Sequence, residues 1–378
     1  MRILFLINVI PPDYGGGFLR VFRIANRFKN YGILYKVATF TNRNRYRSDG
    51  YNIKKNDIVF FKNRLLSGLI LLPWFCICHR KRFDILYIAS TQWFTVIPTM
   101  ICKIRGIKIV LGVTLSMVDS PATRGSNILQ RFVCSLKNSQ FKFADYIFVN
   151  SPLLVNECKS CGYSDKIVKL INNPVDTSLY HPVENDEKRR LRRLEGIPEN
   201  KFTILFVGSI NKRKGCDLLP FIFKKLFQKR ELSLTFVMCG QKGYPETPSI
   251  IDNLTSMFLE NKSTFIVKEE VTDTAPYYQM ADLFLFPTTN EGMPNVVLEA
   301  MACGCMILCN HISGITDYVL PSKCLIEDNR VDTYVKKIDE LLTNSINVSH
   351  IKNENLKRIR RKFSVASVDD NIKKILLS

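Results

Sequence analysis

The chain of 378 residues is longer than one hydrophobic core usually organises, so two domains are expected. With 46% hydrophobic and 23% charged residues it has an ordinary globular composition, which excludes extensive disorder. Its net charge of +20 is uneven: residues 1–180 hold 26 Lys and Arg against 9 Asp and Glu, whereas residues 181–378 hold 28 against 25. The basic first half predicts attraction to a polyanion. An anionic membrane is favoured over nucleic acid, because no nucleic-acid-binding motif accompanies the charge.

The N-terminal stretch "MRILFLINVI" has about nine apolar residues and no small-residue cleavage site, so it is interpreted as a first β-strand and not as a signal peptide. The 12 cysteines follow no disulfide or zinc spacing. Free, mostly buried thiols indicate a reducing cytosol, and no metal site is expected.

Residues 65–78, "LLSGLILLPWFCIC", are apolar and are followed by the basic run "HRKR". Fourteen residues are too few to span a bilayer, which takes about 20. Two interpretations stay open: a buried helix, which is favoured, and a helix lying at the membrane interface.

The first half alternates strand-like runs with helical patterns. "FLRVFRIANRFKNYG" has helical spacing closed by Gly32. Strands separated by helices indicate a parallel sheet. The strand-like runs are "RILFLINVI", "YKVATF", "DILYIAS", "KIVLGVTL" and "ADYIFVNS".

A second series of strands and helices begins after "LINNPVDTSLYHP". Its strand-like runs are "FTILFVGSI", "LSLTFVMCG", "STFIVKEEV", "DLFLFPTT" and "CMILCN". The predicted fold is therefore α/β, with two doubly wound domains whose ligand crevices meet in an interdomain cleft. The expected domains are residues 1–175 and 176–360, with a C-terminal helix in 361–378 that returns to the first domain in one interpretation.

The stretch "FPTTNEGMPNVVLEAMACGC" places two carboxylates, Glu291 and Glu299, eight positions apart. A buried strand precedes it and a helix follows, with Pro294 in the first helical turn and Gly304 beyond the end. The loop therefore lies at a helix amino end, where backbone N–H groups favour a phosphate, and Gly292 allows close backbone approach. A carboxylate accepts hydrogen bonds from paired hydroxyls, so a sugar and a ribose on either side of a diphosphate would satisfy both acids. The alternative is a capping Glu and a surface Glu on a structural helix.

The run "EGMPNVVLEAMACG" is similar to the E-x7-E signature of family 4 of the retaining glycosyltransferases. The resemblance covers most of the chain and is strongest from 200 to 320. It implies the GT-B fold of two facing Rossmann-like domains, and transfer of a sugar from a nucleoside diphosphate to an acceptor hydroxyl with retention of configuration.

"ILFVGSINKRKGCDLL" resembles the opening strand and loop of the family's second domain, which implies that Lys214 binds the donor diphosphate. The family often has Arg directly after the strand glycine, whereas here Ser209 follows Gly208. Lys212 or Arg213 is a candidate for the missing positive charge.

"PPDYGGGFLR" resembles the family's Gly-Gly turn before its first helix, which implies that Gly16 and Gly17 approach the donor or acceptor. "INNPVDTSLYHP" resembles the segment before the family's linker. Asn173 and Asp176 are expected to shape this hinge and are not assigned to substrate.

Many family members carry a histidine near the reacting sugar, but the corresponding stretch here is "VLGVTLSMVDS". Ser116 or Asp119 is a candidate replacement.

In the implied reaction Lys214 and the helix end at Met293, Pro294 and Asn295 stabilise the departing diphosphate. Glu291 orients the sugar and Glu299 holds the ribose. No cofactor is expected, and no D-x-D triplet for a divalent metal is present.

The basic first half and the apolar segment near residue 70 suit a lipid-linked glycan acceptor of a bacterial surface polysaccharide, with the enzyme cytoplasmic and peripheral on the inner membrane face. A non-catalytic nucleic-acid-binding protein is the alternative from another class. A dinucleotide oxidoreductase is disfavoured, because "GGGFLR" fails the G-x-G-x-x-G pattern.

Overall fold

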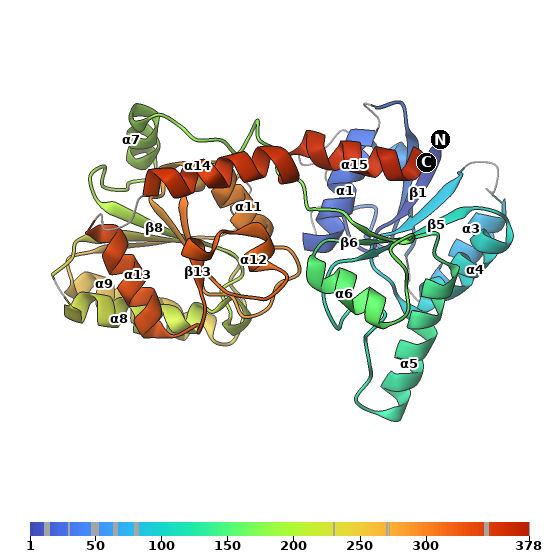
Figure 1. The fold of residues 1–378 in the computed structure, drawn as a ribbon, viewed down its shortest axis with the longest axis horizontal. Coiled ribbons are helices and arrows are strands. Elements are labelled where there is room, and N and C mark those ends of the chain that lie inside the picture. Colours follow the sequence, from blue (N-terminus) through green and yellow to red (C-terminus); the bar gives the residue numbers. More distant parts are fainter. Residues whose placement is uncertain are drawn as a thin grey trace. The chain divides into compact units, whose positions relative to one another are not determined.

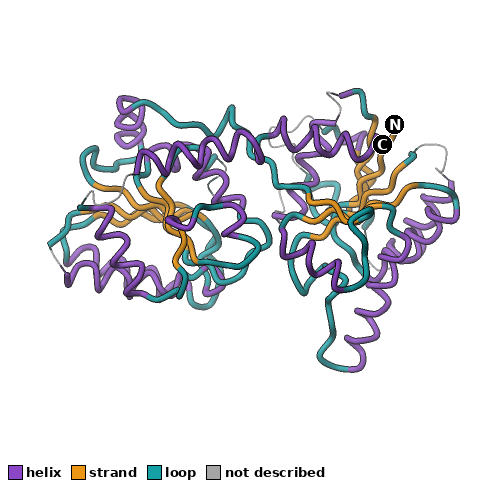
Figure 2. The backbone as a smooth tube through the Cα atoms, viewed as in Figure 1, coloured by secondary structure: helices purple, strands orange, loops and turns teal. Residues whose placement is uncertain are grey.

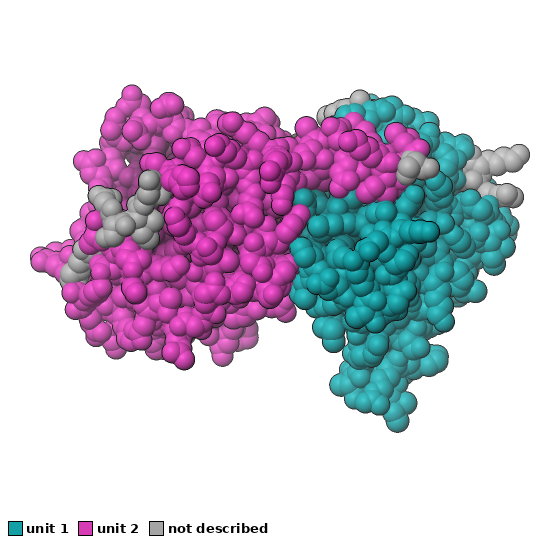
Figure 3. Space-filling model, viewed as in Figure 1, with its two compact units in different colours: residues 1–173 teal, residues 174–378 magenta. Residues whose placement is uncertain are grey.

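The computed structural model describes residues 1–10, 16–28, 31–46, 53–62, 67–78, 83–229, 231–269, 271, 273–343 and 348–377. The chain forms two compact units, residues 1–173 and 174–378 (Figure 3). Each unit is a parallel β-sheet covered by helices, so the predicted α/β class is correct (Figure 2).

The sheet of the first unit has the strand order β3-β2-β1-β4-β5-β6-β7, and all its strand pairs are parallel. The order reverses between β1 and β4, the point where ligands bind in open α/β sheets. The strands are β1 (Arg2–Leu6), β2 (Leu34–Thr39), β3 (Ile58–Phe60), β4 (Ile85–Ile88), β5 (Lys108–Val113), β6 (Tyr146–Val149) and β7 (Val168–Leu170).

Both faces of this sheet are covered. On one face Phe28 of α1 packs against Phe5 of β1, with ring centroids 5.9 Å apart. The other face carries a continuous apolar core with α3, α4 and α6, while α5 projects from the body of the unit (Figure 1). The helices are α1 (Gly16–Phe28), α3 (Leu72–Cys78), α4 (Val96–Ile104), α5 (Ile128–Ser139) and α6 (Pro152–Ser160).

The apolar segment near residue 70 is only partly buried, so the favoured prediction of a buried helix is wrong in part. It forms a π-helical turn, η3 (Ser67–Leu71), that continues into α3. Leu72, Pro73 and Cys76 face the core, whereas Trp74 is exposed. The basic run 79–82 lies outside the described residues. In the part of the chain that is described, no helix combines the length and the apolar character needed to cross a membrane.

The second unit has the strand order β10-β9-β8-β11-β12-β13, again parallel throughout. Its central strands are apolar along their whole length because helices cover both sides. The strands are β8 (Phe202–Val207), β9 (Leu234–Cys239), β10 (Thr264–Lys268), β11 (Leu283–Phe286), β12 (Met306–Asn310) and β13 (Leu325–Ile326).

Helices α8, α9 and α13 lie on one side of this sheet and α11 and α14 on the other (Figure 1). The segment that opens the unit is tied to its C-terminal part, because the Val175 N–H donates to the Phe363 carbonyl at 2.8 Å. The helices are α7 (Asn185–Leu194), α8 (Leu219–Lys229), α9 (Thr247–Glu260), α10 (Ala275–Met280), α11 (Asn295–Ala302), α12 (Thr316–Val319), α13 (Val331–Leu342), α14 (Val348–Arg358) and α15 (Val365–Leu377).

Every strand predicted from the sequence is present, but β3, β7 and β13 were missed. These strands have only three, three and two residues, too few for an apolar alternation to register. All 12 cysteines are unpaired thiols and most are buried.

Candidate functional site

The candidate site lies at the carboxyl ends of β8 and β11, two neighbours between which the strand order of the second sheet reverses. Two loops leave the sheet here. One follows β8 and contains Gly208 to Gly215; the other follows β11 and leads through Glu291 into α11. At such a point the two loops diverge, which leaves room for a ligand.

The loop after β8 is held in shape by its own side chains. The Lys214 N–H donates to Asn211 Oδ1 at 3.1 Å and closes the short turn η7 (Lys212–Lys214). Gly215 follows with φ of +72°, and a Cβ there would lie 2.0 Å from the Pro287 carbonyl oxygen. Only glycine fits this position, and its close packing on the β11 loop fixes the Lys214 side chain relative to that loop.

Lys214 and Glu291 meet across the two loops. Lys214 Nζ donates to Glu291 Oε1 at 2.5 Å and lies 5.1 Å from the centre of the Phe286 ring. Glu291 Oε1 also accepts from the Thr288 hydroxyl at 2.9 Å. Both ionic side chains are largely shielded from solvent. In the described part of the chain Oε2 of Glu291 has no hydrogen bond, so one carboxylate oxygen stays available to a ligand hydroxyl.

Arg213 holds the two loops together. Its guanidinium donates to the Asn290 carbonyl at 2.8 Å and lies 3.7 Å from Glu291 Oε1. Its own carbonyl accepts from the N–H of Thr289 at 3.0 Å. Arg213 therefore adds positive charge next to Lys214 and also has a structural role.

Glu299 lies on α11 and is buried. Its Oε2 accepts from the hydroxyl of the fully buried Tyr278 on α10, at 3.2 Å. Burial raises the pKa of the Tyr278 phenol well above its usual value, and the neighbouring Glu299 adds to this, so the hydroxyl is a donor at neutral pH. The glutamate is thus anchored and does not point freely into bulk water.

Helix α11 begins at Asn295, with Pro294 in the capping position, so the prediction that Pro294 lies in the first helical turn is wrong by one residue. No side chain caps this end of the helix. Met293 and Pro294 are buried beneath the turn. The positive end of the helix dipole therefore faces the loop that carries Glu291.

The other residues of this unit that were predicted to bind the donor lie in the same two loops: Gly208 and Ser209 after β8, and Gly292 after β11. Gly208 has φ of +151°, and its carbonyl oxygen would lie 1.8 Å from a Cβ on Gly240, so the backbone is tightly packed there. The Ser209 carbonyl accepts from the Asn211 N–H at 3.0 Å and from the Cys216 thiol at 3.9 Å. Gly292 forms a bend without a left-handed backbone. Gly215, which sequence reasoning passed over, is the position where the loop requires glycine.

In the first unit Gly16 and Gly17 open α1 itself and do not form a turn before it, while residues 11–15 lie outside the described residues. Asp119 is buried and accepts from the N–H groups of Thr114 and Leu115 at 3.0 and 2.9 Å, so it organises its own loop. Burial raises the pKa of this carboxyl, and these N–H bonds oppose the rise. The Ser116 hydroxyl bonds to Glu157.

Two further residues of the hinge were predicted to be structural. Asp176 accepts from the N–H and the hydroxyl of Ser178, at 3.0 and 2.6 Å, and so stabilises a turn. Asn173 is buried at the end of the first unit.

Two site residues had no signal of their own in the sequence. Thr288 is one of two adjacent threonines after β11, and only the fold shows that its hydroxyl supports Glu291. Tyr278 precedes Glu299 by 21 residues and reaches it only because α10 packs beside α11.

Comparison with known proteins gives the site a context. Residues 187–362 match the family model described as glycosyl transferases group 1. The α-galactosylglucosyldiacylglycerol synthase of Streptococcus pneumoniae is 28% identical over 188 residues, 48% of this chain and 46% of that protein. The capsular polysaccharide biosynthesis glycosyltransferase CapM of Staphylococcus aureus is 27% identical over 207 residues, 54% of this chain and 50% of CapM. The chain thus aligns with about half the length of these curated relatives.

Among solved structures, Anabaena Alr3699/HepE in complex with UDP and glucose superposes with a TM-score of 0.79 and 20% identity, covering 100% of both chains. The sucrose-phosphate synthase of Thermosynechococcus elongatus superposes with a TM-score of 0.77 and 14% identity, covering 100% of this chain and 98% of that chain. The chain has the GT-B fold, with two parallel-sheet α/β units. The site described above falls inside the segment that matches the glycosyltransferase family model.

Proposed function

We propose that the chain is a retaining glycosyltransferase that moves a sugar from a nucleoside-diphosphate donor to an acceptor hydroxyl. The observation that carries this proposal is the Lys214–Glu291 pair beside the uncapped end of α11, at the switch point of the second sheet. A cation and a helix amino end suit a diphosphate, and a carboxylate with one unbonded oxygen suits a sugar hydroxyl.

Departure of the diphosphate builds negative charge, which preorganised positive groups stabilise. An ammonium has three donors, so Lys214 has donors left for a phosphate oxygen while it remains beside Glu291. Glu291 then orients the sugar through Oε2, and Glu299, fixed by Tyr278, accepts from the two ribose hydroxyls. In the proposed same-face attack the acceptor oxygen bonds to the anomeric carbon as the bond to the diphosphate breaks, and the diphosphate oxygen takes the acceptor's proton.

The relatives suggest the chemical class of donor and acceptor. HepE was solved with UDP and glucose, so a uridine diphosphate sugar is the first donor to test. The diacylglycerol glycolipid synthase and CapM act in glycolipid and capsule synthesis by name. A lipid-linked glycan for a bacterial surface polysaccharide is the proposed acceptor, and neither a metal nor a cofactor takes part in the proposed reaction.

The first unit offers a surface for the membrane that such an acceptor requires. Trp74 on α3 is 64% exposed and Ile104 on α4 is 82% exposed. Arg105 donates to the Ile77 carbonyl at 3.1 Å, which ties the ends of α3 and α4 together. The exposed apolar side chains of both helices therefore lie close together on a unit with a large basic excess, and we propose peripheral binding there to the inner face of the membrane.

A transfer assay tests the proposal. The purified chain is incubated with UDP-glucose, UDP-galactose, UDP-N-acetylglucosamine and GDP-mannose, together with extracted polyprenyl-diphosphate glycans, with and without EDTA. Nucleotide release that requires both donor and acceptor, and that EDTA does not reduce, is the expected result. Loss of the reaction on chelation would refute the metal-independent form of the mechanism, and formation of a β-linked product from an α-linked donor would refute retention.

A further inference from the structure

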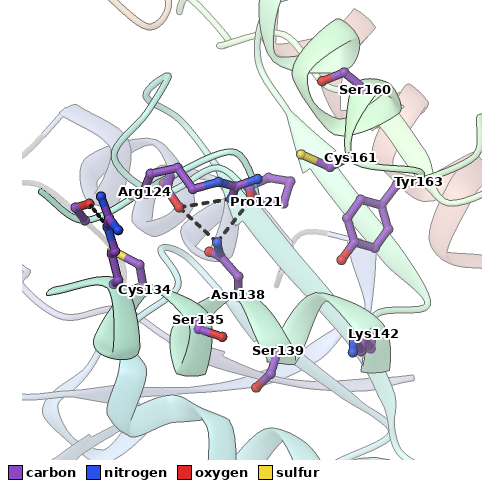
Figure 4. A pocket seen from close by; sticks show the side chains of 13 residues that line it. Pro121, Arg124, Cys134, Ser135, Asn138, Ser139, Lys142, Ser160, Cys161 and Tyr163 are labelled. Atoms are coloured by element: carbon purple, nitrogen blue, oxygen red, sulfur yellow. Dashed lines mark hydrogen bonds between the residues drawn. The ribbon is translucent and has the colours of Figure 1, made fainter. Parts of the chain in front are cut away.

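A cavity of about 510 Å³ lies in the first unit between α5, the loop that precedes it and the end of α6 (Figure 4). It belongs to neither of the two loops of the donor site, which are in the other unit. Its lining combines basic, hydroxyl and apolar groups. The lining residues are Pro121, Thr123, Arg124, Gly125, Arg131, Cys134, Ser135, Asn138, Ser139, Lys142, Ser160, Cys161 and Tyr163.

The lining carries three cations, Arg124, Arg131 and Lys142, and none of its members is Asp or Glu. Figure 4 shows Tyr163 and Cys161 on one side, with Ser139 and Lys142 opposite them. Burial raises the pKa of the Tyr163 phenol, so its hydroxyl is a donor at neutral pH. Within the described residues neither that hydroxyl nor Lys142 Nζ has a hydrogen-bonding or ion-pair partner. Unpaired donors and uncompensated positive charge together suit a phosphoryl group.

The same helix presents apolar side chains next to the cavity. Ile128 is 87% exposed, Leu129 is 72% exposed and Phe132 is 66% exposed, all in the first turns of α5. Arg131, which lines the cavity, lies among them in the sequence. Figure 1 shows this end of α5 projecting from the unit. Large apolar side chains beside a basic pocket are the arrangement expected for an element that enters the headgroup layer of a bilayer.

We propose that the cavity beside α5 binds the phosphoryl headgroup of an anionic membrane lipid, while Ile128, Leu129 and Phe132 enter the acyl region next to it. The basic excess of the first unit favours an anionic membrane as the occupant over an uncharged protein surface. The inference rests on the membrane binding that is part of the proposed function. It adds a contact with a lipid headgroup, separate from the α3–α4 surface, by which we mean the exposed apolar side chains of α3 and α4 that include Trp74 and Ile104.

The test is sedimentation of the full chain with vesicles of phosphatidylcholine alone or with 30% phosphatidylglycerol. The variant Arg124→Gln/Arg131→Gln/Lys142→Gln removes the three cavity cations. The matched control, Arg43→Gln/Lys108→Gln/Lys166→Gln, removes three exposed cations of the same unit that lie outside the cavity. Since a basic side chain held against an anionic surface strengthens binding about fivefold, we expect the loss of all three cavity cations to lower the affinity by about 100-fold and the control by about threefold or less.

Equal losses of vesicle affinity in the two variants would overturn the proposal, because they would show that the overall charge of the unit attracts the membrane and that the cavity is not a specific site. Unchanged binding of the cavity variant would overturn it as well. Titration of the wild type and the cavity variant with inorganic pyrophosphate distinguishes the sources, because the variant leaves the donor site of the second unit intact. The proposal expects the cavity to contribute only millimolar or weaker binding, whereas micromolar binding that the cavity variant loses, with no vesicle preference, would assign the cavity to a soluble phosphate compound. None of these measurements depends on sugar transfer. If the protein bound no nucleotide sugar, the proposed function would be refuted, but the outcome of the vesicle experiment would still decide the headgroup site.

Discussion

At the scale of single residues, the side chain of Lys214 pairs with Glu291 and faces the proposed diphosphate site. Lys214→Ala removes a preorganised charge that acts most strongly on the developing diphosphate, so we expect kcat to fall by about 100- to 1000-fold. Steady-state kinetics with saturating donor measures this.

The neighbouring Lys212 is the matched control, since it is exposed and its side chain makes no contact with Glu291. Lys212→Ala should change kcat by about twofold or less, as expected for surface substitutions. Equal losses in the two variants would show that only the total charge of the "KRK" run matters.

Glu299 is expected to act on binding and not on the chemical step. Its carboxylate is anchored by Tyr278 and would accept from the donor ribose. Hydrogen bonds to a charged group contribute about 1.5–3 kcal/mol, so Glu299→Gln should weaken donor affinity by about 10- to 150-fold. Calorimetric titration with the nucleoside diphosphate measures the change. A normal Kd with a reduced kcat would move Glu299 from the ribose to the reacting sugar.

At the scale of elements, the two loops at the switch point depend on Gly215. Gly215→Ala forces a left-handed backbone that costs about 1–2 kcal/mol and places a methyl group against the Pro287 carbonyl. Gly196 has almost the same φ, +69°, but open space around it. Gly196→Ala is therefore the control for the backbone penalty alone.

We expect Gly215→Ala to lower the free energy of unfolding by more than Gly196→Ala and also to weaken donor binding, which Gly196→Ala leaves unchanged. Urea unfolding and calorimetric titration measure the two effects. Equal destabilisation with unaltered donor binding would mean that the loop adapts to the added methyl group.

Elements differ in how far the sequence predicts them. The β11–loop–α11 segment follows from local signals: an apolar run, a loop with Gly292, and a proline at the helix start. The Lys214–Glu291 contact joins residues 77 positions apart, and it depends on β8 and β11 being sheet neighbours. The resemblance to a family assigned Lys214 and Glu291 to one donor site, but the contact between them follows only from the fold.

The exposure of α3 illustrates the opposite case. A nearly continuous apolar run such as "LLSGLILLPWFCIC" is compatible with both a buried and an interfacial helix, because no polar periodicity separates the two faces. Only the packed fold shows that Cys76 is buried and Trp74 is not.

At the scale of the whole molecule, the charge asymmetry and the exposed α3–α4 surface predict salt-dependent attachment to anionic vesicles. Trp74→Ser should lower the affinity for such vesicles by about tenfold, since an apolar side chain of this size contributes about 1.5 kcal/mol or more when buried. Sedimentation at two salt concentrations measures it.

Leu194→Ser, which alters a side chain 68% exposed on α7 of the second unit, is the matched control and should leave vesicle binding unchanged. If vesicle binding responded neither to salt nor to either substitution, the prediction that the first unit binds membranes through its positive charge and its exposed apolar side chains would be wrong.

Saturation-transfer NMR of the full chain with a panel of nucleotide sugars tests the donor site most directly. We predict saturation of the ribose and sugar protons of at least one nucleoside-diphosphate sugar, competition by the matching nucleoside diphosphate, and loss of the ribose signal in Glu299→Ala. A panel in which no compound takes up saturation, or in which the Glu299→Ala and wild-type spectra are the same, would contradict the account.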